Sequence, residues 1–425
     1  MRGVLWLLAL FAIAVVSALF AGNNHNTVTL FWDPYRVDVS LNLALAGLIA
    51  LFLVLHLALN GVSALLHIPQ QARQWRLSHR ERAIYTTLLD ALALLVSGRF
   101  VRARKAAERV LEMDRAVEHS GEKLPYGARL RAMTHLVAAE GAHAVQDRTV
   151  RDAHHAHAAE LSAGREGQDI FDGVRLRAAR WAFDDRDAAR TLLWLNQLPP
   201  GTGRRTLALR LRFKSARLAG DARVALDTAR QLTKHRAFSD LAGASIARGL
   251  AIEILQTAHD PAQVQRAWNG LEERERHMPD VALYATERLL SHGGNARMAD
   301  EWLQPVWNQA TLSPHGVTEV QRVQLVQVLE ALLSKSEEGI DAEWLRRLEH
   351  AQRTHPREAA WQYLGGVVCA RLQLWGKAQQ LLMQAVGGLV DAGLRRRAWR
   401  LLGAMAEEQQ DTAAALKAYR EAARS

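Results

Sequence analysis

The sequence predicts an all-α protein, with an N-terminal two-helix transmembrane hairpin followed by an α-solenoid of stacked helix pairs. Ala, Leu and Arg dominate the composition, Pro occurs only 10 times in 425 residues, and runs rich in Val, Ile and Thr are almost absent, which favours helices. Two long apolar runs open the chain, and regularly spaced small and aromatic residues follow them. The chain is too long for one ordinary compact core, whereas a repeat array accommodates this length.

The first apolar run, Val4 to Ala21, contains no charged residue and spans roughly 27 Å as a helix, close to the thickness of a bilayer core. The second run, Leu41 to Leu59, is broken only by Asn42 and His56. Together the runs predict two membrane spans within residues 1–66, joined by a short loop. The alternative for the first run is a cleavable signal peptide, because a basic residue precedes it and small residues end it.

A basic juxtamembrane segment, residues 67–82, follows the second span. By the positive-inside rule this segment predicts that both termini and the whole repeat region lie in the cytoplasm. The loop between the spans, residues 22–40, carries Phe31, Trp32 and Tyr35, which we expect to act as interfacial aromatics that set the depth of the anchor. The membrane-proximal basic residues are Arg73, Arg76, Arg80 and Arg82.

The net charge of +10 and the pI near 10.1 raise the question of nucleic-acid binding. Asp and Glu are interleaved with the basic residues nearly everywhere, and a positive balance also suits a protein held against an anionic leaflet. We therefore expect no nucleic-acid partner. Two denser basic clusters are either solvated helix faces or surfaces for acidic lipids, a propionate-bearing ligand or an acidic partner. They are Arg204, Arg205, Arg210 and Arg212, and Arg395, Arg396, Arg397 and Arg400.

The last residues, 396–425, carry the pattern of one helix pair. Apolar and small residues share one face of the first helix, and alanines and a tyrosine recur at three and four residues on the second. A Trp, Leu-Gly, aromatic and Ala sequence spread over about 34 residues is the tetratricopeptide signature. The residues predicted to pack this repeat are Trp399, Leu402, Gly403, Ala415, Tyr419 and Ala422.

Earlier segments repeat the same register: a turn residue, an aromatic or small residue, then an alanine. These alanines are Ala103, Ala189, Ala225, Ala299, Ala378 and Ala415. The recurrence predicts tetratricopeptide-like helical repeats over residues 83–340 and C-terminal tetratricopeptide repeats over 341–425, stacked as a right-handed superhelix whose concave groove binds a peptide or helix of another protein. Further predicted packing residues are Gly98, Phe100, Gly220, Leu364, Gly365 and Trp375.

A histidine cluster is the most conspicuous candidate site. His154 and His157 stand one helical turn apart and could share a metal ion or an iron porphyrin, the alternative being a helix face without a ligand. His56 within the second span is a further weak candidate. The sequence contains no nucleophile elbow, phosphate-binding glycine loop or paired zinc-ligand helix, so we expect no catalytic residue, metal or cofactor. Cys369 is the single cysteine and excludes an internal disulfide.

Several stretches give the chain a family resemblance. Besides the two spans, these are TVTLFWDPYRVDVSL at Thr27 to Leu41, ALLVSGRFVRARKAAER at Ala93 to Arg109 and LWGKAQQLL at Leu374 to Leu382. They resemble the HemY family of proteobacterial inner-membrane proteins over nearly the whole chain. The flavin-dependent protoporphyrinogen oxidase that shares this name is a different protein, and its dinucleotide-binding glycine fingerprint is missing here. The resemblance implies a bacterial inner-membrane location and a link to a late stage of protohaem biosynthesis, without a catalytic residue to carry over.

Three functions agree with these observations. The leading hypothesis is a membrane-tethered scaffold that docks haem-pathway enzymes through the repeat groove and raises the local concentration of poorly soluble intermediates. The second is a haem or porphyrin carrier that uses His154, His157 or His56 as ligands. The third is a general envelope-assembly adaptor unrelated to haem. The sequence leaves the oligomeric state and the identity of the partner open.

Overall fold

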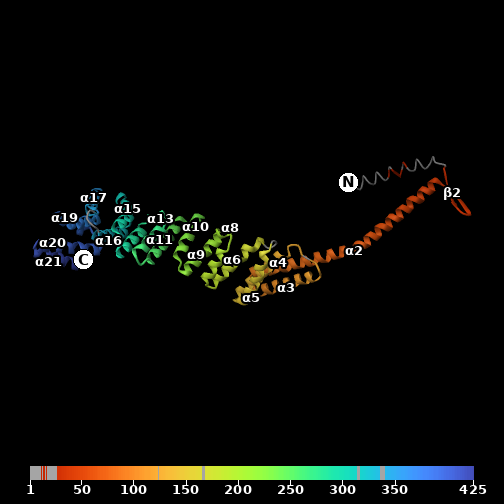
Figure 1. Ribbon diagram of the computed structural model, residues 1–425, viewed down its shortest axis with the longest axis horizontal. Helices are drawn as coiled ribbons and strands as arrows, with labels where there is room; N and C mark the ends of the chain where they lie inside the picture. The colour runs from red at the N-terminus through yellow and green to blue at the C-terminus, as the bar shows by residue number, and fades with distance from the viewer. Residues whose placement is uncertain are drawn as a thin grey trace. The chain divides into compact units, whose positions relative to one another are not determined.

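The computed structural model describes residues 11, 13, 14, 16 and 26–425, apart from residues 123, 165–167, 314–315 and 336–339; of 62–74, 169 and 340–341 it describes the backbone alone. Most of the first apolar run, Val4 to Ala21, lies outside the described residues, so the two-helix transmembrane hairpin stays a prediction. The chain divides into two compact units, Met1–Gly167 and Gln168–Ser425 (Figure 1). The predicted domain boundary at 340/341 falls within the second unit.

A β-hairpin replaces the loop predicted between the spans. Strand β1, Thr27–Trp32, pairs in antiparallel register with β2, Tyr35–Ser40. Val, Thr and aromatic residues alternate through this segment, and Asp33 and Pro34 form the turn, which is the composition of a hairpin. The all-α prediction missed this element because each strand has only six residues and the hairpin lies between two apolar runs.

The longest helix, α2, runs from Leu41 to Val96 and is about 84 Å long at 1.5 Å per residue. The Ser40 side chain caps it by accepting a hydrogen bond from the backbone N–H of Leu43 at 3.3 Å. Its segment Leu41–Gly61 is long and apolar enough to cross a membrane, is not buried against protein, and is the one such helix in the described part of the chain. From Ile84 onward α2 buries one side against the rest of its unit.

Three more helices follow α2 in the described part of the first unit: α3 (Phe100–His119), α4 (Gly127–Ala144) and α5 (Arg148–Ala163). The C-terminal part of α2 packs on α3 and α4, and α4 packs on α5. Their shared core includes Ile84, Ala107, Val110, Leu130 and Ala138. Two helix pairs, α2 with α3 and α4 with α5, therefore follow the span directly.

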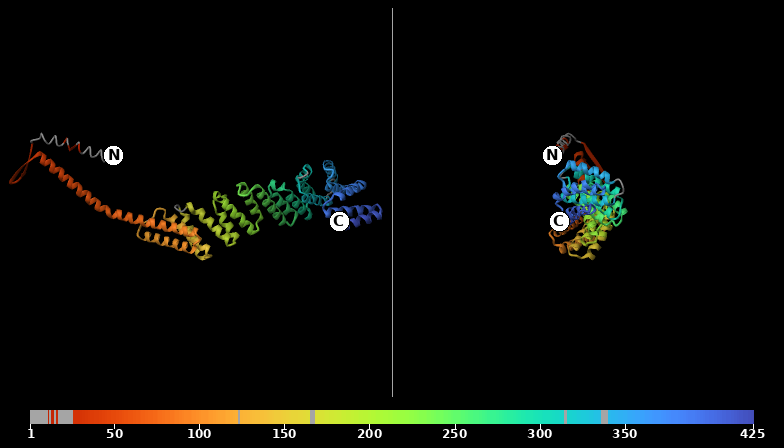
Figure 2. Two further views of the ribbon diagram at one scale, coloured as in Figure 1. Left: turned by 180° about the vertical axis from the view of Figure 1, so that it is seen from behind. Right: turned by 90° about the vertical axis from the view of Figure 1, so that its left-hand side faces the viewer.

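The second unit stacks helix pairs in chain order, as Figures 1 and 2 show from opposite sides. In most pairs the two helices pack on each other, whereas α17 packs on α18. The first helices of consecutive pairs also pack together at α6·α9, α11·α14, α14·α16 and α16·α18, as in an α-solenoid. We call these the first helices and their partners the second helices. The pairs are α6 (Gln168–Asp184) with α7 (Ala188–Asn196), α9 (Thr206–Ala219) with α10 (Ala222–Lys234), α11 (Asp240–Gln256) with α12 (Pro261–Asn269), α14 (Pro279–Ser291) with α15 (Ala296–Leu312), α16 (Glu319–Lys335) with α17 (Ile340–Thr354), α18 (Ala359–Arg371) with α19 (Trp375–Gly388), and α20 (Ala392–Glu408) with α21 (Thr412–Arg424); the short α8 (Pro200–Gly203) and α13 (Glu273–Arg276) lie between pairs.

The turn inside several pairs follows one local rule. A residue with positive φ is followed by an aspartate whose side chain accepts a hydrogen bond from the backbone N–H three residues later, as at Gly220 and Asp221. The fourth residue after the aspartate then faces the first helix, and Ala225 is fully buried there. In α7 this position is Thr191, which is fully buried, whereas Ala189 is exposed. The predicted register at Ala189 was therefore wrong.

Candidate functional site

The first helices are connected by a row of polar contacts. Arg217 of α9 pairs with Glu253 of α11. On α14, Asp280 accepts from Arg248 of α11 at 2.8 Å and from Gln321 of α16 at 2.7 Å. Each of these contacts joins side chains from two pairs, and several members are half exposed. Their energetic value is therefore modest, but they fix the spacing of consecutive first helices.

The row continues toward the C-terminus through α18 and α20. Arg322 of α16 donates to Glu358, the N-cap of α18, at 2.8 Å. Glu330 of α16 accepts from the Tyr363 hydroxyl at 2.7 Å and from Arg397 of α20 at 2.9 Å. Burial and the Glu330 carboxylate both raise the pKa of Tyr363, so the phenol stays a hydrogen-bond donor at neutral pH. These contacts join α16, α18 and α20 on the same row.

A hollow of about 490 Å³ opens where α11, α14 and α16 lie side by side. We call it the first-helix groove. Ile252, Tyr284 and Val328 supply apolar surface, while Glu287 and Gln324 are exposed polar side chains at its mouth. A mixed surface of this kind can accept apolar side chains of a peptide while the polar groups bond its backbone. The remaining lining residues are Arg248, Gly249, Asp280 and Leu283.

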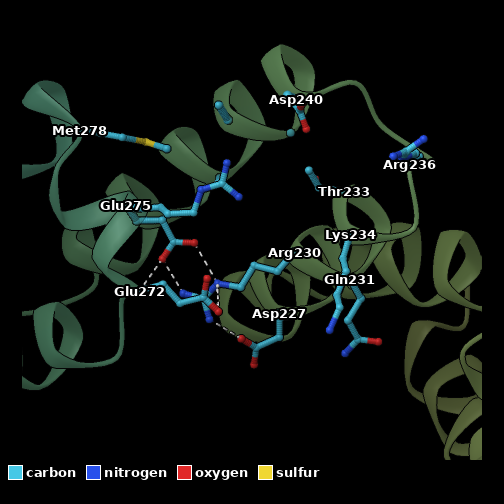
Figure 3. A pocket seen from close by; sticks show the side chains of 14 residues that line it. Asp227, Arg230, Gln231, Thr233, Lys234, Arg236, Asp240, Glu272, Glu275 and Met278 are labelled. Atoms are coloured by element: carbon cyan, nitrogen blue, oxygen red, sulfur yellow. Dashed lines mark hydrogen bonds and ion pairs between the residues drawn. The ribbon is translucent and has the colours of Figure 1, made fainter.

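A larger hollow, about 820 Å³, lies between α10, α11 and α13 (Figure 3). Arg230 is held inside it by Glu275, with its Nε 2.8 Å from Oε1, and by Asp227 at 2.8 Å. The cations Arg230, Lys234, Arg236 and Arg274 in its lining are matched by the anions Asp227, Asp240, Glu272 and Glu275. Since its charges balance and Arg230 is already paired, this hollow favours no charged ligand, and its ion pairs join α10 to α13.

The two candidate histidines of α5 lie beside a third, His135 of α4, which the sequence analysis did not single out. The Nδ1 atoms of His135 and His154 are 2.9 Å apart, so one ring donates to the other. The His135 and His157 rings have centroids 5.1 Å apart. The three rings, with Glu108, Glu112 and Arg115, line a hollow of about 400 Å³ in the first unit. No spacing rule within one helix could have found His135, because it comes from another helix.

The electrostatics of this cluster favour neutral imidazoles. Burial, together with His154 and His157, lowers the pKa of His135 to about 4. Burial also lowers the pKa of His154, against the opposing effect of Glu108. Within the described residues, no group of three or more His, Cys, Asp or Glu side chains is arranged to hold a metal ion. The arrangement therefore favours the neutral form of His135 and His154, whose Nδ1 atoms are engaged in a mutual hydrogen bond.

The remaining candidate ligand, His56, is not part of this cluster. It lies in the membrane-length segment of α2, where the Asn60 amide donates to its Nε2 at 3.0 Å and Phe52 stacks on its ring at 6.2 Å. Both partners are one turn away on the same helix. His56 thus has local partners and is not brought together with His154 and His157.

The predicted packing residues lie mostly at helix contacts or turns. Ala103, Ala225, Ala299, Ala378, Ala415 and Ala422 are buried in second helices, and Leu364, Gly365, Leu402 and Gly403 are buried in first helices. Gly98 and Gly220 take φ of 74° and 71° at turns, where a side chain would be strained. Phe100, Trp375 and Trp399 are half-buried, whereas Tyr419 is 36% exposed and donates to Glu407 at 3.0 Å.

Glycines mark two close approaches between the helices of C-terminal pairs. A Cβ on Gly403 would lie 2.8 Å from the ring of Tyr419, so α20 and α21 meet there. The equivalent glycine of the preceding pair is Gly366, where a Cβ would lie 2.6 Å from Leu382 of α19. Gly365, the predicted packing glycine, instead faces Gln352 of α17. The rotation of α18 about its own axis decides which of these two adjacent glycines faces α19.

The basic residues after the span differ in their surroundings. Arg76 and Arg82 are exposed, whereas Arg80 donates to Ser120 at 3.4 Å and lies 3.9 Å from Glu122. The side chain of Arg73 lies outside the described residues. Cys369 is fully buried in α18, and burial raises the pKa of its thiol, which disfavours the reactive thiolate.

Comparisons with known proteins list solved structures and one family model that are similar to parts of this chain. Among solved structures, the chain is similar to the TPR domain of P58(IPK), with 15% identity, coverage of 77% of this chain and 99% of that chain, and a TM-score of 0.23. It is also similar to Naa15/Naa10 bound to HypK-THB, with 13% identity, coverage of 80% and 64%, and a TM-score of 0.18. No curated protein matches the chain. Residues 27–146 match the family described as the HemY protein N-terminus, so this stretch of the chain is a HemY N-terminal region.

Proposed function

We propose that this chain is a non-enzymatic scaffold, anchored in the bacterial inner membrane, whose repeats dock other proteins on the cytoplasmic side. The observation that carries the proposal is the first-helix groove, which joins apolar and polar side chains from three consecutive pairs on an exposed surface. Such a groove suits an extended peptide or a helix of a partner protein. The membrane-length segment of α2 leads directly into the first helix pair, as a tether requires.

The proposed partners are enzymes of late haem biosynthesis. Support comes from the family, whose name links it to haem, and from the physical benefit of a tether. Poorly soluble tetrapyrrole intermediates are transferred more efficiently when successive enzymes are held close together at one membrane. The repeats would then serve to collect these enzymes, without taking part in their chemistry.

Crosslinked co-purification of the tagged full-length chain from native membranes tests this function. The groove variant combines Glu287→Arg and Gln324→Ala, which change exposed side chains of two first helices. A matched control combines Glu301→Arg and Gln309→Ala, which make the same chemical changes on exposed positions of the second helix α15. We expect haem-pathway enzymes to be recovered with the unaltered chain and with the control, and to be depleted with the groove variant.

Two results would contradict the proposal. Equal recovery of haem-pathway enzymes with both variants would show that the first-helix groove does not bind them. Recovery of unrelated envelope proteins alone would favour the general adaptor and remove the link to haem.

The haem-carrier alternative is favoured by one observation, the third histidine that joins His154 and His157. Titrating the purified full-length chain with haemin and following the Soret band tests it. A spectral shift that is lost in a His135→Ala and His157→Ala double variant would support a carrier. A spectrum equal to that of free haemin at all ratios would exclude it.

A further inference from the structure

The β-hairpin has one face made entirely of apolar side chains. Side chains alternate between the two faces of a strand, and the register of β1 with β2 brings residues of one face directly opposite each other. Three apolar cross-strand pairs share this face. They are Val28 with Val39, Leu30 with Val37, and Trp32 with Tyr35. We call this set the apolar face of the hairpin.

Most of this face is exposed in the described part of the chain, while Val28 and Val39 are half-buried. Trp32 is 82% exposed, Tyr35 72%, Leu30 58% and Val37 50%. A cluster of large apolar side chains this exposed marks a surface that another phase or molecule covers. The two strands alone cannot bury it, because a two-stranded hairpin has no second layer.

The opposite face is polar apart from one ring. It carries the pairs Thr27 with Ser40, Thr29 with Asp38, and Phe31 with Arg36. The Arg36 guanidinium lies 5.6 Å from the Phe31 ring centroid, and its Nε is 3.5 Å from an Asp38 oxygen. The charges of the hairpin thus gather on one side, and the hairpin is amphipathic across its thickness.

The hairpin is joined to the membrane-length segment without a linker. Strand β2 ends at Ser40, which caps α2, and the segment begins at Leu41. The backbone N–H of Leu41 also donates to the carbonyl of Asn26, just before β1, at 2.9 Å. Both ends of the hairpin are therefore fixed at the N-terminal end of that segment, the place where a span leaves the hydrocarbon core.

We propose that the apolar face of the hairpin lies on the bilayer, in the interfacial layer at the N-terminal end of α2. This inference rests on the proposed membrane insertion of α2. Continuity with the span argues for lipid as the covering phase, since the hairpin cannot leave the membrane surface by more than its own length, about 20 Å for six residues. Trp and Tyr are the side chains that favour this layer, because their rings are apolar and their N–H and O–H groups remain hydrated.

The backbone explains why the hairpin rests in the interface and not deeper. Among the residues that the structure describes, both strands are edge strands, so each has one row of N–H and C=O groups without a partner strand. Such groups cannot be satisfied in hydrocarbon, but water and lipid headgroups satisfy them at the interface. The hairpin therefore lies in the interfacial layer and fixes the depth to which α2 is inserted.

Fluorescence quenching on the full-length chain tests this orientation. Cys369→Ala removes the native cysteine, and single cysteines are then introduced by Leu30→Cys on the apolar face and by Thr29→Cys on the polar face. Each is labelled with bimane and reconstituted in phosphatidylcholine and phosphatidylglycerol vesicles that carry a headgroup-proximal nitroxide lipid. The proposal requires at least threefold stronger lipid quenching at residue 30 than at 29, and stronger quenching by aqueous iodide at 29. Val37→Cys and Asp38→Cys repeat the comparison on β2.

A third label position separates this inference from the proposed anchor. Leu51→Cys reports on the middle of the membrane-length segment through a deep nitroxide lipid. If residue 51 is not quenched, α2 does not insert, and both the anchor and the hairpin orientation fail. If residue 51 is quenched while residues 29 and 30 respond alike, only the hairpin orientation fails. Protection of residue 30 from iodide without quenching by lipid would mean that protein covers the apolar face, which also overturns the proposal.

Discussion

Replacing Glu275 with alanine should loosen the junction between α10 and α13. The Glu275 carboxylate is 3% exposed and accepts from Arg230 Nε at 2.8 Å, from Arg230 Nη2, and from the Glu272 backbone N–H at 2.9 Å. The last bond belongs to the capping box of α13. The variant therefore removes two charge-assisted hydrogen bonds and one capping hydrogen bond. It also leaves the positive charge of Arg230 less well compensated by carboxylates.

The expected loss in local stability is about 3 kcal/mol. Removing one partner of a buried ion pair costs roughly 3–5 kcal/mol. The Arg230 side chain is 19% exposed and keeps Asp227 at 2.8 Å and Glu272 at 3.5 Å, so the lower end of that range applies. A loss of about 3 kcal/mol raises the local opening constant roughly 100-fold, since each 1.4 kcal/mol is a factor of ten.

Hydrogen exchange of the full-length chain in detergent measures this opening constant by segment. Repeat arrays open through their nearest-neighbour contacts, so exchange should accelerate in α10, α11 and α13 and stay unchanged in α20 and α21. Glu273→Ala is the matched control, because Glu273 is an exposed neighbour on the same short helix. Glu275→Gln should lie between the two, since the amide oxygen still accepts but carries no charge.

The explanation would be refuted if Glu275→Ala and Glu273→Ala gave equal exchange in α10. A second check uses Arg230→Met combined with Glu275→Leu. Replacing both partners avoids an unpaired charge, so this double variant should be more stable than Glu275→Ala alone. If the double variant were less stable than Glu275→Ala, the two side chains would stabilise the junction through their packing and not through charge compensation.

Three further predictions concern other parts of the chain. The pKa of His135 is lowered to about 4 from an ordinary 6.5, so the unfolded state binds the proton first as the pH falls. The stability of the first unit should therefore fall as the pH drops from 6.5 toward 4, by about 2 kcal/mol at pH 5. Thermal melts at pH 7.5 and 5.0 measure this loss, and His135→Asn should remove it. Gly366→Ala should destabilise α18 and α19 by about 1–3 kcal/mol, since the new methyl group meets buried Leu382. The control Gly376→Ala, whose new methyl group has nothing within 4 Å, should stabilise the chain by about 0.5 kcal/mol. Urea melts compare the two variants, and equal shifts would contradict the close approach at Gly366. Asp221→Ala should cost about 1 kcal/mol because it removes the N-cap bond of α10, which exchange of the first α10 amides would report.

The sequence by itself determined the helix pairs, the membrane-length segment of α2 and most turn positions, because these depend on neighbours along the chain. A helix repeats every 3.6 residues and a turn needs particular residues at fixed places, so Gly220 and Ala225 could be placed without a partner in view. The hairpin at 27–40 was missed although its alternation is also local. The strands are short and the apolar run from Leu41 follows them directly, so the two-residue period of the strands is not separated from the helix that comes next.

Only the tertiary structure decided which side chains meet across helices. His135 joins His154 because α4 packs on α5, and Glu275 reaches Arg230 because α13 borders the same hollow as α10. The choice of Gly366 over Gly365 depends on the rotation of α18, and the groove exists because α11, α14 and α16 align. Periodicity identifies the face of a helix that is buried, but the depth, angle and partner of that face are set by packing between helices, which a single helix sequence does not contain.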